Sequence, residues 1–383
     1  MRTLLHAFST FSLGGAQSRF IQLANAYGSE FEHVIVAMDG NFSAASRLQT
    51  HVRWRPLDVK VVRGSGLANR RPFRTQLQRL KPDGLFTYNF GAIEWAAANW
   101  PRLGSHVHVE DGFGAQEAQA QLPRRVWTRR VVLGLGGGQL VVPSRTLASL
   151  VGGWWIPPAR WRYIPNGVPV AADAHARRSP DPARPVTIGS VAGLRPEKNF
   201  ARLIKACGNL KSRHDLRLVL MGDGTERAAL ERIAEASGLG SRMVFAGHVD
   251  SPRERLAELD LFALSSDTEQ LPLALLDALA QGIPAVSTRV GDVPHVLPAV
   301  AHAALCDPDD AAFERTLDAV LNRRTEWPVW AEAGLAQVRA AYTEAQMLEN
   351  WHQVFSGRLS ALAAGPGDRA ADSPIKPSSS ALP

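Results

Sequence analysis

Short runs of aliphatic and β-branched residues alternate with helix-like segments along most of the chain, and this alternation restricts the fold more than any other feature. Parallel strands need a crossover connection, usually a helix, so a strand–helix repeat predicts parallel sheets with helices on both faces. The predicted strands are residues 2–7, 33–38, 59–62, 84–88, 106–110, 139–142, 186–191, 216–221, 243–246, 261–264, 284–288 and 303–306. The predicted helices between them are residues 16–28, 73–80, 92–99, 116–132, 144–151, 199–210, 225–237, 252–258, 272–281 and 309–322.

With 383 residues the chain is longer than a single hydrophobic core usually supports, so we expect two domains. Proline, glycine and short polar residues replace the periodic hydrophobic residues at 163–185, which indicates a connection. We therefore predict an α/β fold of two doubly wound, Rossmann-like domains facing a central cleft, at residues 1–167 and 168–343. A last helix at 344–361 is predicted to pack back on the first domain, and the composition of 364–383 is typical of a disordered tail.

The composition, 45% hydrophobic and 21% charged, is that of a globular protein. Its two cysteines, Cys207 and Cys306, form no metal-binding or disulfide pattern, which favours a reducing cytoplasm. The first residues carry one basic side chain and a short apolar run broken by His6, so they predict a buried strand rather than a signal peptide. Since no stretch approaches the roughly 18 apolar residues of a membrane span, we expect a cytoplasmic protein that meets a membrane only from its surface.

Positive charge is concentrated in the first half of the chain. The net charge is +7, and residues 1–170 hold 20 Lys and Arg against 9 Asp and Glu. Four arginines surround Trp127 in the stretch LPRRVWTRRVVL: Arg124, Arg125, Arg129 and Arg130. Such a surface would attract anionic lipid at the inner face of the plasma membrane, a lipid diphosphate or nucleic acid, and the alternative is a merely solvated basic face. We expect no nucleic-acid partner, because no recognition motif or interleaved aromatic platform is present.

The stretch TEQLPLALLDALAQGIPAVST, residues 268–288, contains two acids in an otherwise apolar run. Pro272 suits the first turn of a helix and Gly282 the position after its end, which places Glu269 in the preceding loop and Asp277 inside the helix. A carboxylate at the edge of an apolar stripe is costly unless it accepts hydrogen bonds, and sugar hydroxyls can donate them. The spacing fits a nucleoside diphosphate sugar; the alternative is a capping acid plus a solvated acid.

The same stretch resembles the E-x7-E signature of the retaining glycosyltransferases of family 4, which have the GT-B fold. Further segments resemble that family in the same order: STFSLGGAQ (9–17), VVPSRTLASL (141–150), YIPNGV (163–168), SVAGLRPEKNFARLIKA (190–206), LVLMGDGTERAALERIAEASGL (218–239) and MVFAGHV (243–249). Singly, the glycine pairs are weak signals. The ordered set predicts the fold and a nucleotide-sugar site.

The resemblance implies an enzyme that moves a sugar from a UDP- or GDP-linked donor to an acceptor, by front-face attack in which the leaving diphosphate helps to deprotonate the acceptor. The basic half and Trp127 favour a lipid-linked or polysaccharide acceptor in bacterial envelope or exopolysaccharide synthesis, and the alternative is a small soluble acceptor. No metal is expected, since DPDD at 307–310 more readily begins a helix than binds a cation. Cations on the protein must then meet the negative charge that develops on the leaving group.

Four residues are the expected catalytic set. Through their match to the family, Glu269 faces the donor sugar and Lys198 the diphosphate. The family usually has an arginine where this chain has Gly193, so we expect Arg195 to supply the guanidinium. In the first domain Asp111 is the preferred residue near the donor sugar or the acceptor hydroxyl; Glu110, His106 and His108 are alternatives, although each histidine taken singly is expected in the core. The expected donor-binding residues are Gly14, Gly15, Gly222, Gly224, His248, Leu271, Leu273 and Asp277.

Gly193 and Asp277, an aspartate where the family has glutamate, motivate a second hypothesis. The chain could be a nucleotide-sugar-binding protein that has kept the fold and lost turnover. A dehydrogenase is disfavoured because no G-x-G-x-x-G follows the first strand. A sugar epimerase or phosphorylase of similar architecture remains open, although no lysine stands out for the pyridoxal phosphate that a phosphorylase needs.

Overall fold

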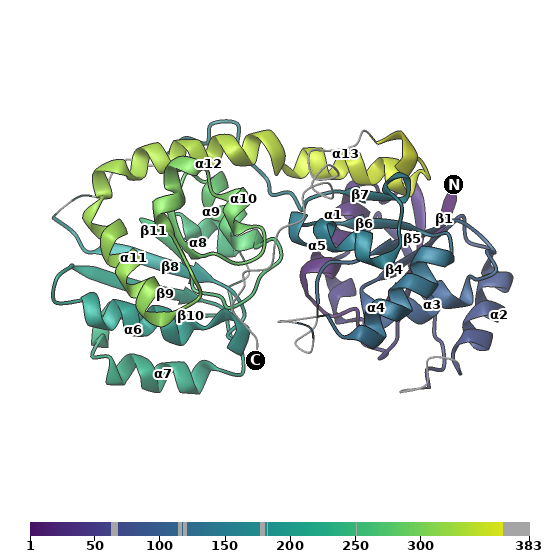
Figure 1. Ribbon diagram of the computed structural model, residues 1–383, viewed down its shortest axis with the longest axis horizontal. Helices are drawn as coiled ribbons and strands as arrows, with labels where there is room; N and C mark the ends of the chain where they lie inside the picture. Colours follow the sequence, from purple (N-terminus) through teal and green to yellow (C-terminus); the bar gives the residue numbers. More distant parts are fainter. Residues whose placement is uncertain are drawn as a thin grey trace. The chain divides into compact units, whose positions relative to one another are not determined.

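The computed structural model describes residues 1–62, 68–113, 117, 121–176, 181, 183–249 and 251–362. The chain divides into two compact units (Figure 1). The first consists of Met1–Pro165 and Leu348–Pro383, and the second of Asn166–Met347. The tail predicted at 364–383 lies outside the described residues.

The first unit is built on a seven-stranded sheet in the order β3-β2-β1-β4-β5-β6-β7, and its described strand pairs are parallel. The strands are β1 (Arg2–Phe8), β2 (Phe31–Ala37), β3 (Arg53–Pro56), β4 (Gly84–Tyr88), β5 (His106–Val109), β6 (Gln139–Val142) and β7 (Trp161–Tyr163). The main helices are α1 (Gly15–Ala26), α2 (Arg70–Leu80), α3 (Ile93–Ala98), α4 (Pro123–Arg129), the π-helix η4 (Arg130–Leu135) and α5 (Arg145–Val151). β4 and β5 are buried along their whole length, as expected for a parallel sheet covered on both faces.

The second unit has a six-stranded parallel sheet in the order β10-β9-β8-β11-β12-β13. Its strands are β8 (Val186–Val191), β9 (Leu216–Met221), β10 (Met243–Gly247), β11 (Leu261–Leu264), β12 (Ala285–Thr288) and β13 (Leu305–Cys306). Its helices are α6 (Phe200–Leu210), α7 (Arg227–Ala236), α8 (Pro252–Leu256), α9 (Leu273–Ala280), α10 (Val293–Val296), α11 (Asp310–Asn322) and α12 (Trp327–Ala341). The predicted doubly wound α/β architecture is therefore present in both units.

Two predicted elements of the first unit were wrong. The strand predicted at 59–62 is a loop, and the strand that pairs with β2 is β3, at the sheet edge. β3 has the sequence RWRP, so its polarity hid it, whereas Val59 and Val61 pack on the core from the loop. The helix predicted over 116–132 begins at Pro123 and continues as the π-helix.

Three elements were not predicted at all: β7, α10 and α12. The three residues of β7 are too few to show an alternating pattern, and the four residues of α10 are too few to show a helical one. In α12 two tryptophans and a proline open the segment and weaken its helical signal, yet Trp327, Trp330, Leu335 and Val338 are buried.

The last helix, α13 (Glu344–Phe355), ends earlier than predicted, and a short 3-10 turn follows at Leu359–Ala361. Trp351 and Phe355 on this helix are fully buried. The Phe355 ring packs edge-on against His6 and Phe86 of the first unit, at centroid distances of 5.7 and 5.1 Å.

Candidate functional site

The strand order of the second unit creates a topological switch between β8 and β11. From β8 the chain proceeds to β9 and β10 on one side, and then returns to β11, β12 and β13 on the other. In open parallel sheets the loops at the carboxyl ends of the strands diverge at such a point and leave a crevice for ligands. The loops that follow β8 and β11 carry Lys198 and Glu269.

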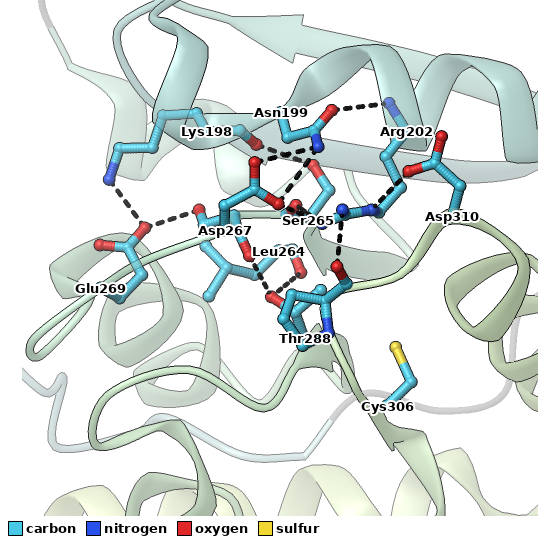
Figure 2. A network of polar contacts seen from close by, with 12 residues as sticks. Lys198, Asn199, Arg202, Leu264, Ser265, Asp267, Glu269, Thr288, Cys306 and Asp310 are labelled. Atoms are coloured by element: carbon cyan, nitrogen blue, oxygen red, sulfur yellow. Dashed lines mark hydrogen bonds and ion pairs between the residues drawn. The ribbon is translucent and has the colours of Figure 1, made fainter. Parts of the chain in front are cut away.

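Lys198 and Glu269 meet at this switch point (Figure 2). The Lys198 Nζ donates to Glu269 Oε1 at 2.7 Å, and the Ser266 hydroxyl donates to the same oxygen at 2.7 Å. The two charged side chains are only 17% and 10% exposed. A largely desolvated carboxylate is thus held between an ammonium and a hydroxyl. The sequence analysis had predicted that both charged residues contact the same nucleotide-sugar.

Backbone contacts tie the two loops together. The Ser265 hydroxyl donates to the Lys198 carbonyl at 3.1 Å, and the Asp267 N–H donates to the Glu197 carbonyl at 2.9 Å. Thr288, at the end of β12, donates its hydroxyl to the Ser266 carbonyl at 2.7 Å. The positions of the lysine and the glutamate are therefore coupled through the chain itself.

Arg202 on α6 is the buried centre of this network, and sequence reasoning missed it. Its guanidinium donates to the carbonyls of Ser265 and Pro308, both at 2.9 Å. It also pairs with Asp267 at 2.9 Å and with Asp310 at 3.0 Å. A basic residue in the first turn of a helix, where acids are preferred, was the available signal for a structural role.

The glycines at 222 and 224 allow the loops after β8 and β9 to approach closely. Gly222 has φ +140°, and an added Cβ would lie 1.9 Å from the Ala192 carbonyl oxygen. A Cβ on Gly224 would lie 2.4 Å from the Leu194 carbonyl oxygen. Both glycines thus shape the wall of the crevice, whether or not a ligand touches them.

Arg195 lies beside Gly193, where the family usually has an arginine. A Cβ added to Gly193 would lie 3.4 Å from Arg195 Nε. The arginine is mostly exposed and forms an ion pair with Glu197 at 3.3 Å. The Arg195 side chain therefore lies in contact distance of any side chain at 193.

Asp277 is a partly buried residue of α9. Burial raises the pKa of its carboxyl to about 6, Arg253 opposes this rise, and Glu344 adds to it. Leu271 is buried before the helix, and Leu273 at its start is only partly buried, so the predicted apolar stripe is shifted toward Leu275.

His248, the remaining predicted donor contact of this unit, is exposed directly after β10. In the strand order β10 is separated from β8 by β9. The residue before His248, Gly247, accepts a hydrogen bond from the Gly222 N–H at 2.8 Å, so His248 follows a residue that contacts the glycine loop after β9.

In the first unit the glycine loop follows β1 and Asp111 follows β5, and β4 lies between these two strands. Gly14 and Gly15 are exposed at the start of α1, directly after the loop that follows β1. Arg19 of the same helix is buried, and both of its terminal nitrogens donate to the Asp111 carboxylate. The Asp111 N–H donates to Asn89 Oδ1 at 2.7 Å. Asp111 is thus a carboxylate engaged by an arginine that the sequence analysis did not single out.

The histidines that were alternatives to Asp111 are core residues. His106 and His108 both share hydrogen bonds with the Thr87 hydroxyl, at 2.9 and 2.8 Å. Burial, with smaller contributions from His108 and Arg102, lowers the pKa of His106 to about 3. His106 is therefore neutral at physiological pH and unsuited to carry charge.

Among the residues that the structure describes, no group of His, Cys, Asp or Glu is arranged to hold a metal ion. Within the same residues no helix has the length and apolar character needed to cross a membrane.

Two family models match the chain. The model for glycosyltransferase family 4 matches residues 13–172, and the model for glycosyl transferases group 1 matches residues 172–335. The chain belongs to the group 1 glycosyltransferases. This confirms the family predicted from the sequence motifs.

Curated relatives of this glycosyltransferase family match over parts of their length. The N-acetyl-alpha-D-glucosaminyl L-malate synthase of Bacillus anthracis is 32% identical over 120 residues, which are 31% of this chain and 32% of the relative. The lipopolysaccharide core biosynthesis glycosyltransferase LpsE of Rhizobium meliloti is 39% identical over 108 residues, 28% of this chain and 31% of the relative. The chain thus spans about a third of the length of these two relatives.

The predicted GT-B fold is confirmed by solved structures. HepE from Anabaena, crystallised in complex with UDP, superposes with a TM-score of 0.77 at 14% identity, covering 93% of this chain and all of HepE. At this identity the likeness shows the fold, and the activity has to be argued from the site.

Proposed function

We propose that this glycosyltransferase family member transfers a sugar, with retention of anomeric configuration, from a nucleoside diphosphate donor to a lipid-linked or polysaccharide acceptor. The observation that carries the proposal is the contact between Lys198 and Glu269 at the topological switch point. HepE was crystallised with UDP and glucose, which supports a UDP-linked donor. The GDP-mannose-dependent alpha-mannosyltransferase of Mycolicibacterium smegmatis is 28% identical over 218 residues, so GDP is the other candidate nucleotide of the donor.

Donor binding exchanges the partners of this ion pair. The diphosphate takes the Lys198 ammonium, and Glu269 is then free to accept hydrogen bonds from the sugar hydroxyls. The ribose hydroxyls donate to Asp277. Since the Lys198–Glu269 pair is mostly desolvated, each charge needs a new partner, and a ligand that supplies only one of the two binds poorly.

In the transfer step the bond between the anomeric carbon and the diphosphate oxygen breaks as the acceptor oxygen attacks from the same face. The acceptor proton passes to the leaving diphosphate. Lys198 and Arg195 stabilise the negative charge that develops on the diphosphate, which is the work a divalent metal would otherwise do. We therefore propose turnover without an added metal.

The acceptor and its setting are proposed from relatives and from charge. LpsE is a lipopolysaccharide core enzyme by name, and the O-antigen biosynthesis glycosyltransferase WclY of Escherichia coli is 26% identical over 145 residues. An acceptor of bacterial envelope synthesis, bound mainly by the basic first unit and Asp111, fits these names. The protein would then act in the cytoplasm at the inner face of the plasma membrane.

A turnover assay distinguishes this proposal from a binding protein without activity. UDP-, GDP- and ADP-sugars are incubated with the protein with and without lipid-linked glycan acceptors, with EDTA present, and release of nucleoside diphosphate is measured. We expect acceptor-dependent release from one donor, a product with the donor's anomeric configuration by NMR, and a loss of at least a hundredfold in Glu269→Gln. The control is Lys205→Ala, an exposed lysine on α6. Donor binding without any release would favour the binding-protein alternative.

A further inference from the structure

One surface of the first unit, named the tryptophan face, consists of Arg124, Trp127, Val131, Leu135 and Trp155. The first four recur at helical spacing along α4 and the π-helix η4, so they lie on one side of a continuous helical segment. The four apolar members are 55%, 42%, 65% and 46% exposed, in chain order. Large apolar side chains gathered in one place on a surface mark an interaction site.

This helical segment has apolar side chains on both its inner and its outer side. Its inner side holds Leu133, which is buried in the hydrophobic core, and Arg129, which is fully buried and donates to Glu110 at 3.0 Å and to Glu117 at 3.2 Å. The rings of Phe113 and Trp154 lie about 5 Å from the Arg129 guanidinium. A surface helix normally turns its apolar side inward and a polar side outward, whereas here a second apolar stripe faces out. The prediction that Arg129 belongs to an exposed basic surface was therefore wrong.

The backbone holds the second tryptophan outward. Trp154 is buried, and the adjacent Trp155 has φ +60°, a left-handed conformation that costs a non-glycine residue roughly 1 kcal/mol. The rings of Trp127 and Trp155 pack edge-on at 5.2 Å, and the Arg130 guanidinium lies 5.0 Å from the Trp155 ring. The face is thus a preformed pair of exposed indoles with a cation at its rim.

Charge around the face is of one sign. Residues 118–172 contain seven arginines and neither aspartate nor glutamate. Arg129 is neutralised internally and Arg125 pairs with Glu117, which leaves Arg124, exposed at the start of α4, and Arg130 at the rim. The matching surface must therefore be apolar at its centre and anionic around it.

We propose that the tryptophan face docks on the interface of an anionic lipid bilayer. Indole rings favour the level of the lipid headgroups, where their apolar body is buried and their N–H stays hydrated. Arginines beside them attract anionic headgroups, each contributing about 1 kcal/mol near the surface. Val131 and Leu135 would enter the acyl boundary alongside the indoles, as in interfacial amphipathic helices. This inference rests on the membrane setting of the proposed function and assigns the surface that makes the contact, with none of the residues assigned to the donor.

The test is flotation of the full-length protein with vesicles of phosphatidylcholine alone or with 30% phosphatidylglycerol. The variants are Trp127→Ser/Trp155→Ser, Arg124→Gln/Arg130→Gln and the single change Val131→Ser. The matched control is Trp100→Ser, because Trp100 is 53% exposed in the same unit and outside the face. We expect wild type and Trp100→Ser to bind the anionic vesicles with a blue shift in tryptophan emission. The tryptophan pair and the arginine pair should each lose at least tenfold in partitioning.

The melting temperature identifies any variant that fails to fold. If the tryptophan pair fails to fold, Val131→Ser still tests the face, because it leaves the indoles in place and should lower vesicle partitioning about threefold. Equal binding of neutral and anionic vesicles, or unchanged binding of the tryptophan and Val131 variants, would overturn the proposal. Sedimentation velocity tests whether a second copy of the chain occupies the face. A dimer of the wild type that the tryptophan pair abolishes would assign the face to a second copy of the chain and also overturn it.

Discussion

Gly193 and Asp277 are the two positions at which this chain departs from its family's motif, and the structure gives each a physical setting. A Cβ added to Gly193 would be in ordinary contact with the Arg195 Nε, at 3.4 Å, so the two positions are neighbours. Asp277 keeps its acceptor oxygens in a partly buried position, where its charge is disfavoured. Asp277 keeps the two acceptor oxygens of a carboxylate, and Arg195 is the residue that we propose to replace the guanidinium missing at Gly193.

We predict that Arg195→Ala weakens donor binding about tenfold, because a charge-assisted hydrogen bond is worth about 1.5–3 kcal/mol. Adding Gly193→Arg to that variant should recover most of the loss, since both positions direct a guanidinium into the same space. Arg217→Ala, an exposed arginine near the start of β9, is the matched control. Titration calorimetry with the nucleotide-sugar measures the effect. A double variant as weak as Arg195→Ala alone would argue against this compensation.

Asp277 predicts how stability and donor affinity change with pH. Its folded pKa of about 6 lies above the ordinary value near 4, so the unfolded chain loses this proton first and the free energy of unfolding falls between about pH 4 and pH 6. Above pH 6 the full penalty remains. Asp277→Asn should therefore raise stability at pH 8 more than at pH 4, measured by urea unfolding.

Donor binding should show the opposite trend, because ribose hydroxyls donate to the ionised carboxylate. We expect the affinity for a nucleotide-sugar to rise severalfold between pH 5 and pH 7 in the wild type and to stay level in Asp277→Asn. The sugar-linked nucleotide is the right probe, since it lacks the terminal phosphate that titrates in this range. A parallel pH dependence in both proteins would show that Asp277 does not contact the donor.

At the scale of elements, the site depends on how α6 holds the loop after β11. Arg202 joins the carbonyls of Ser265 and Pro308, so one buried guanidinium links the ends of β11 and β13. Lysine cannot make these contacts together, because it lacks the planar fork of donors. Arg202 is therefore a positioning residue for the loop that carries Glu269.

We predict that Arg202→Met lowers the free energy of unfolding by about 2–4 kcal/mol, since it leaves buried carbonyls and two acids without their partner. Donor affinity should fall about tenfold, and Arg202→Lys should recover stability in part and affinity less. Lys205→Met on the same helix is the control. Loss of stability with unchanged donor affinity in Arg202→Met would limit Arg202 to a purely structural role.

The sequence analysis located the elements whose own residues show a clear hydrophobic pattern. Interior strands of both sheets, such as β4, β8 and β9, are short runs in which apolar residues dominate, and they were located to the residue. β3 escaped because an edge strand with arginines at alternate positions has no such run. The motif residues Lys198 and Glu269 could be paired from family order, whereas Arg19 and Arg202 could not, because their partners lie far away in sequence and carry no motif.

At the scale of the whole molecule, the chain returns to its first unit through α13. Phe355 is fully buried among aromatic residues of that unit, 5.1 Å from Phe86 and 5.7 Å from Phe31. The first unit is therefore completed by residues from the far end of the chain, while the Lys198–Glu269 pair belongs to the second.

We predict that Phe355→Ala lowers the free energy of unfolding of the first unit by about 3–5 kcal/mol, the usual cost of emptying a buried aromatic site. The second unit should keep its donor-binding site. Differential scanning calorimetry would then show an early transition that is insensitive to donor and a later one that donor still raises. Loss of donor binding before any unfolding would contradict this division.

The central claim is that a nucleotide-sugar binds at the Lys198–Glu269 pair. The most direct measurement is titration calorimetry of the wild type, Lys198→Ala, Glu269→Gln and the Lys205→Ala control with UDP- and GDP-sugars at constant pH. The account predicts binding of one donor by the wild type and the control, with at least a tenfold loss in each site variant. Glu269→Gln should keep more affinity for the free nucleoside diphosphate than for the nucleotide-sugar. Equal affinities in all four proteins, or no binding of any donor to the wild type, would contradict it.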